Sequence, residues 1–151
     1  MKDACFTIEF VTHCLAGGGN PEEDIPDTFQ RDSKDNIITQ ASWWHAAFTR
    51  AIDLARLRNE VVATDIQVDP MIQAKTGQYE RRFGEFESSR IHEAIMAGTK
   101  ITVNAMVEDH ITQAMLKTIL ERMGKYVGFS VYGHKLGMGK FNVITVTVQE
   151  D

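Results

Sequence analysis

The sequence predicts a single α+β domain, and three observations lead to this prediction. Four segments have the composition or the apolar–polar alternation of strands with one face in a core. Two other segments repeat apolar residues every three or four positions, which is typical of helices packed on one side. The chain has 151 residues, of which 43% are apolar and 25% charged. This composition is ordinary for one globular domain, so we expect a single domain over residues 1–151.

The first half of the chain predicts a strand, a loop and a helix. Residues 4–12 alternate and form the first expected strand. The acidic stretch 22–35 has no period, so we expect a long loop there. Residues 42–57 have the apolar spacing of a helix. The apolar residues expected to face the core are Phe6, Ile8, Phe10, Trp43, Ala47, Ala51 and Leu54.

The second half predicts three strands, a helix and a hairpin. Its strands read as apolar or alternating runs, and its helix repeats apolar residues from Met115 to Met123. A polar stretch around Gly84 has the composition of a hairpin. In chain order we expect a strand at 61–68, the hairpin at 79–91, a strand at 100–107, a helix from Thr112 and a strand at 141–148.

The order strand, helix, strand, strand, helix, strand is that of the ferredoxin-like fold, βαββαβ. We therefore expect a four-stranded antiparallel sheet with two helices on one face. A long loop would follow the first strand, and the hairpin would follow the second.

Charge and cysteine content limit the possible functions. Sixteen Lys and Arg against 21 Asp and Glu give a net charge of −5. This balance opposes non-specific binding to nucleic acid but allows a local basic groove. No apolar stretch reaches the roughly 18 residues of a membrane span. Cys5 and Cys14 lack zinc-ligand spacing, so we expect a cytoplasmic protein without a metal, a cofactor or a membrane partner.

A glycine-rich segment at 133–140 precedes the last expected strand. Glycines let backbone amides approach a phosphate closely, and lysines beside them add positive charge. The segment could instead be a connection that needs tight turns. Its candidate binding residues are His134, Lys135, Gly137, Gly139 and Lys140.

The hairpin segment combines arginines with aromatic residues. This combination suits a single-stranded nucleic acid or a nucleotide, because charge follows the phosphates and rings stack on bases. Its arginines could instead pair with Glu80, Glu85 and Glu87 on a solvated hairpin. The candidate binding residues are Tyr79, Arg81, Arg82, Phe83 and Arg90.

Acidic and histidine residues leave an enzymatic alternative open. Asp27 and Asp32 could assist RNA cleavage with a metal ion, although the acidic stretch lacks the spacing of an EF-hand. His134 or His13 could act as a general acid or base. The acidic stretch could equally be a solvated loop.

The stretch Arg31–Ser42, which reads RDSKDNIITQAS before an apolar helix, resembles a motif of the RAMP superfamily. That superfamily comprises ferredoxin-like RNA-binding and RNA-processing proteins of CRISPR systems. Gly133, Gly137, Gly139 and Phe141 occupy the place of the family's glycine-rich loop before its last strand. The resemblance is distant and indicates a solitary version of the fold, such as a phage or another mobile element would encode.

The resemblance implies a non-enzymatic protein that binds RNA or a nucleotide, as a homo-oligomer or within a protein complex. In RAMP subunits that cut RNA, a loop aspartate after the first strand performs the cleavage, and Asp27 is its nearest counterpart. A small endoribonuclease is therefore one alternative. Another is a phage protein that inhibits a host defence complex or sequesters a signalling nucleotide.

Overall fold

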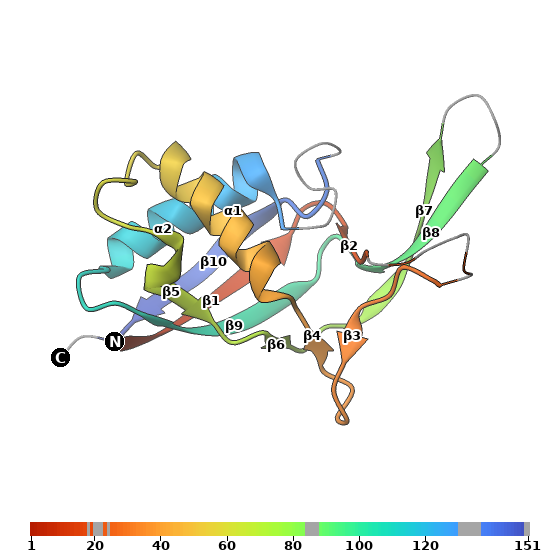
Figure 1. Ribbon diagram of the computed structural model, residues 1–151, viewed down its shortest axis with the longest axis horizontal. Helices are drawn as coiled ribbons and strands as arrows, with labels where there is room; N and C mark the ends of the chain where they lie inside the picture. The colour runs from red at the N-terminus through yellow and green to blue at the C-terminus, as the bar shows by residue number, and fades with distance from the viewer. Residues whose placement is uncertain (18, 20–22, 24, 84–87, 130–136, 150–151) are drawn as a thin grey trace.

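The computed structural model is α+β, with its strands in three sheets and two α-helices (Figure 1). It describes residues 1–17, 19, 23, 25–83, 88–129 and 137–149, and for 82, 83 and 88 only the backbone. All statements below concern these residues.

The largest sheet is antiparallel and has four strands in the order β10-β1-β9-β5. Its strands are β1 (Lys2–Phe10), β5 (Ile66–Val68), β9 (Lys100–Val107) and β10 (Phe141–Val148). The predicted alternation in β1 is confirmed, because Phe6, Ile8 and Phe10 are all buried. Ile101 and Val103 of β9 line the same core, so one face of this sheet is apolar.

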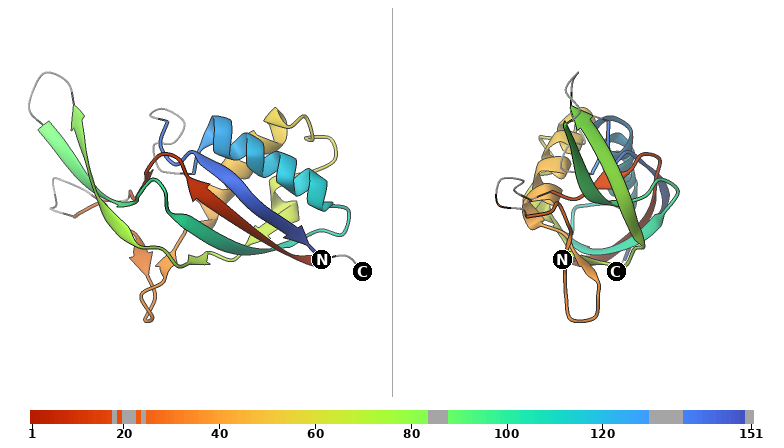
Figure 2. Two further views of the ribbon diagram at one scale, coloured as in Figure 1. Left: turned by 180° about the vertical axis from the view of Figure 1, so that it is seen from behind. Right: turned by 90° about the vertical axis from the view of Figure 1, so that its right-hand side faces the viewer.

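Two helices cover that apolar face (Figures 1 and 2). Helix α1 (Ala41–Leu54) begins after Gln40, one residue earlier than expected and without a side-chain cap. Helix α2 (Gln113–Arg122) is capped by Thr112, whose hydroxyl accepts a hydrogen bond from the Met115 amide. Trp44 packs in the core, and its ring stacks on Phe129 with 3.9 Å between ring centroids.

A π-helix (η3, Met123–Val127) continues α2. The backbone N–H of Gly128 donates to the Met123 carbonyl over 2.7 Å and closes the wider turn. A short 3-10 helix (η2, Ala63–Asp65) precedes β5, so only the end of the strand expected at 61–68 is extended.

The remaining strands form two smaller sheets. The first contains β2 (Cys14–Leu15), β8 (Ser88–Ile95) and β7 (Thr76–Phe83), in that order. The second contains β3 (Gln30–Arg31), β4 (Ile37–Ile38) and β6 (Met71–Ile72). The β7–β8 hairpin extends away from the helices, at the end of the molecule opposite the chain termini (Figures 1 and 2).

The prediction of a simple ferredoxin-like domain is therefore wrong. The described residues form ten strands in three sheets, where the sequence predicted one four-stranded sheet with a loop and a hairpin attached. Four of these strands have only two residues, which is too short for alternation to be visible in a sequence. The chain between β1 and α1 contributes β2 to one of the smaller sheets and β3 and β4 to the other.

In the described part of the chain, no helix combines the length and the apolar character that a bilayer crossing requires.

Candidate nucleic-acid interface

The connector between β1 and β2, residues 11–13, contacts both elements that the sequence nominated for binding. Thr12 donates its hydroxyl to the carbonyl of Gly137 (2.8 Å), and the same oxygen accepts the amide of Lys140 (2.9 Å). The amide of Gly139 donates to the carbonyl of His13 over 2.8 Å. On the other side, the ring of His13 lies 5.4 Å from the ring of Tyr79 in β7, measured between centroids.

We call the five residues Thr12, His13, Tyr79, Gly137 and Lys140 the junction site. They come from β7, from the 11–13 connector and from the segment before β10. Their side chains are neither fully buried nor fully exposed. The fold therefore brings the end of the glycine-rich segment and the base of the hairpin to one surface.

Two glycines at this surface have different constraints. Gly137 has a φ of +68° and no atom closer than 3.9 Å to where a Cβ would be. Gly139 has a φ of +70°, and its Cβ would lie 2.2 Å from the Phe129 carbonyl oxygen. Gly137 thus keeps open space above its backbone, whereas Gly139 is required for packing.

The ring of His13 has a defined hydrogen-bonding state. Its Nδ1 accepts the backbone N–H of Ala97 over 2.9 Å. An amide can only donate, so Nδ1 has its lone pair there and the neutral ring has its hydrogen on Nε2. In this state Nε2 can donate to a phosphate or a base, but it has no lone pair with which to act as a general base.

Arg81 and Arg90, predicted to contact phosphate, instead make contacts within the protein. Asp27 is 3% exposed and forms a two-pronged ion pair with Arg90, whose Nη2 lies 2.9 Å from Oδ1. His92 is fully buried and donates from Nδ1 to the carbonyl of Ala16 over 2.7 Å. Arg81 Nε donates to His92 Nε2 over 3.4 Å. We call Asp27, Arg81, Arg90 and His92 the buried charge network.

The same network gives Asp27, the catalytic candidate, a structural role. Its carboxylate also accepts the amide of Gly19 over 2.9 Å, so it fastens the segment after β2 to the hairpin. Strand β8 is joined to this segment by backbone pairing of His92 with Asp27. A buried carboxylate held in an ion pair is not available to bind a metal ion or water.

A second cluster joins the hairpin to the β3–β4–β6 sheet. Glu93 accepts hydrogen bonds from Thr76, from the amide of Phe29 and from Arg31, with which it also forms an ion pair. Burial alone would raise the pKa of Glu93, but these hydrogen bonds together outweigh burial and lower that pKa. The carboxylate is therefore held in its charged form.

Asp32 also has a structural contact. Its carboxylate accepts the amides of Lys34 and Asn36, each over 2.9 Å, within a tight turn. Hydrogen bonds from the backbone and side chain of Asn36 lower the pKa of Asp32, which makes it a weaker base. Among the residues that the structure describes, no three His, Cys, Asp or Glu side chains gather as a metal site would require.

Four predicted residues cannot be compared with the structure. His134 and Lys135 lie outside the described residues, as do the side chains of Arg82 and Phe83. The backbone of Arg82 pairs with Ser89 in the hairpin.

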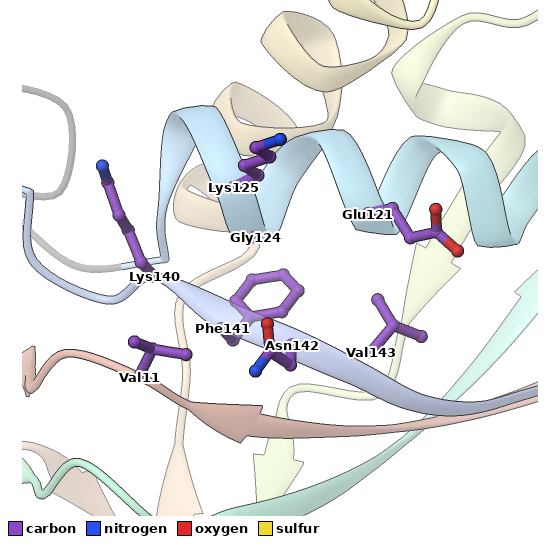
Figure 3. A pocket seen from close by; sticks show the side chains of 8 residues that line it. All are labelled: Val11, Glu121, Gly124, Lys125, Lys140, Phe141, Asn142 and Val143. Carbon is purple, nitrogen blue, oxygen red and sulfur yellow. The ribbon is translucent and has the colours of Figure 1, made fainter.

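A pocket of about 390 Å³ begins beside the junction site (Figure 3). Lys140 lies at one end of it, Lys125 lies above its middle, and Glu121 lies toward the other end. Lys125 and Thr12 could not be nominated from the sequence, because a π-helix has no sequence signature and Thr12 continues the alternation of β1.

Comparison of the sequence with protein-family models finds no match, and comparison with curated proteins finds none either. The fold and the junction site thus define an α+β protein with a candidate polyanion surface.

Proposed function

We propose that this chain is a non-enzymatic RNA- or nucleotide-binding protein of RAMP type that binds its ligand at the junction site. The observation that carries the proposal is the 11–13 connector, which holds Gly137 and Lys140 on one side and Tyr79 on the other. The connector therefore links a lysine and a glycine to an aromatic ring. Positive charge and aromatic rings together are typical of sites that bind single-stranded nucleic acid.

Each residue of the junction site has a role suited to such a ligand. Lys140 supplies positive charge for a phosphate. Gly137 has no side chain and lets the sugar-phosphate backbone of the ligand come close. The partly exposed ring of Tyr79 offers a face on which a base can stack. His13 Nε2 supplies a hydrogen-bond donor between these two groups.

The same contacts favour binding over the endoribonuclease alternative. Asp27 is occupied by Arg90, and Asp32 is occupied by its own turn. His13 has no lone pair on the nitrogen that faces away from Ala97.

A binding titration with fluorescently labelled single-stranded RNA tests the proposal. Tyr79→Ala should weaken binding by about tenfold or more, because stacking of one base contributes about 1–3 kcal/mol. Tyr79→Phe is the matched control and should bind like the wild type, since it keeps the ring. Equal affinity of all three proteins, or no binding by the wild type at low salt, would contradict the proposal.

A further inference from the structure

The pocket between the end of α2 and strand β10 has the chemistry of a site for one nucleotide. Its walls come from the 11–13 connector, α2, η3 and β10 with the residue before it, and its volume of about 390 Å³ lies within the roughly 300–1,000 Å³ of small-ligand pockets. We propose that it binds a single nucleotide unit, with the phosphate on Lys125 and Lys140. This inference rests on the proposed function, because the pocket would hold one nucleotide of the strand that the junction site binds.

Charge is divided along the pocket. Lys140 lies at one end, Lys125 lies on the helix above the middle, and Glu121 lies toward the other end, near Val143 (Figure 3). Glu121 is also 3.9 Å from Lys117, one turn earlier on α2. A phosphate is attracted to the lysine end and repelled from the carboxylate, so the two ends fix the direction in which a nucleotide lies.

The middle of the pocket suits a base. Val11 is 53% exposed, and Val143 is partly exposed on the neighbouring strand. These side chains offer an apolar wall to the face of a ring. Asn142 is exposed beside them, and its amide both donates and accepts hydrogen bonds. Glu121 can accept a hydrogen bond from an exocyclic amino group.

Two features of the backbone shape the pocket, the π-helix η3 and the glycine at position 124. Lys125 belongs to the π-helix η3, and such segments occur frequently at functional sites. Gly124 allows the helix to touch β10, because a Cβ there would lie 2.2 Å from the Phe141 carbonyl oxygen. This close contact forms the floor of the pocket and leaves exposed Lys125 above it.

The lysines must supply the attraction for phosphate themselves. The pocket lies along the C-terminal turns of the helix, where the macrodipole is negative and no unpaired amide points at a ligand. Loss of either lysine should therefore have a large effect. Lys140 also belongs to the junction site, whereas Lys125 does not; its ammonium group also lies 5.3 Å from the centroid of the Tyr126 ring.

Calorimetric titration with nucleoside monophosphates and with inorganic phosphate tests this inference. The wild type should bind at least one nucleotide more tightly than phosphate, since only the nucleotide contacts the apolar wall. Lys125→Ala and Lys140→Ala should each weaken nucleotide binding by about tenfold, the usual cost of losing a charged hydrogen bond. Lys100→Ala is the matched control: it removes an exposed lysine from β9, outside the pocket.

The outcomes separate the pocket from the proposed function. Reduced RNA binding in both Tyr79→Ala and Lys125→Ala, with a salt dependence flattened by about 0.7 in the second, supports both. RNA binding that depends on Tyr79 but not on Lys125 would overturn the pocket and leave the proposed function intact. Nucleotide binding that depends on Lys125, without any RNA binding, would support the pocket and restrict the function to free nucleotides. Equal nucleotide affinity of Lys125→Ala and Lys100→Ala would overturn the pocket.

Discussion

At the scale of single residues, two glycines of similar backbone conformation are expected to differ in what they do. Gly139→Ala should lower the free energy of unfolding by about 2–4 kcal/mol, through strain at positive φ and overlap with Phe129. Gly137→Ala should cost only the strain, about 1–2 kcal/mol, since nothing lies close to its added methyl group. Urea denaturation of both variants measures the difference. Equal losses would show that Phe129 yields to the new methyl group.

The ion pair between Arg90 and Asp27 provides a second prediction. Arg90→Ala should lower the free energy of unfolding by about 3–5 kcal/mol, because it leaves the carboxylate of Asp27 buried and unpaired. Arg58→Ala, which breaks an exposed pair with Asp53, should cost less than about 1 kcal/mol. Chemical denaturation compares the two variants. If the Arg90 variant were as stable as the Arg58 variant, the buried charge network would not hold the hairpin.

At the scale of elements, Glu93 links the hairpin to the β3–β4–β6 sheet and should make the link sensitive to acid. Its pKa is lowered in the folded protein from an ordinary 4.5, so its contribution is complete above that value. The contribution is lost as pH falls below 4.5 through the folded pKa, where Arg31 and Thr76 lose a charged partner. Unfolding free energies at about pH 6 and about pH 3 should therefore differ more in the wild type than in Glu93→Gln. If the free energy of unfolding fell equally with acid in both proteins, the acid sensitivity would come from other carboxyl groups.

The strands show which structural features a sequence reveals. Strands β9 and β10 match the predicted 100–107 and 141–148 at both ends, because eight residues of alternation are a clear signal. Strands β2, β3, β4 and β6 have two residues each. Strand β2 and the β4–β6 pair are held by pairing with distant segments, and β3 pairs only with β4 across a short turn. No local pattern encodes such pairing, so the two smaller sheets could not be predicted.

The candidate site could be predicted only in part, because residue type suggests a ligand contact but does not show which charges pair within the protein. Residue type alone nominated Tyr79, Gly137 and Lys140, and the fold places all three at the junction site. Residue type also nominated Arg81 and Arg90, but it could not reveal that buried His92 and Asp27 would bind them. Charge in a sequence indicates a ligand surface only where the fold leaves the charge unpaired.

At the scale of the whole molecule, binding at one localised site is compatible with a net charge of −5 and a polyanionic ligand. Two of the acidic residues, Asp27 and Glu93, are paired with arginines. Such a protein should bind nucleic acid at a defined place instead of along its surface. Substitutions at the junction site should therefore change the affinity strongly, whereas substitutions of charged residues elsewhere on the surface should change it little.

The most direct test of the central claim is mass spectrometry of the ligand extracted from protein purified at low salt. The account predicts RNA or nucleotides in the extract of the wild type, in much smaller amount from Tyr79→Ala and in unchanged amount from Tyr79→Phe. A wild-type extract that contains no nucleotide would contradict the account. So would an equal amount from Tyr79→Ala, because the ligand would then be bound somewhere other than the junction site.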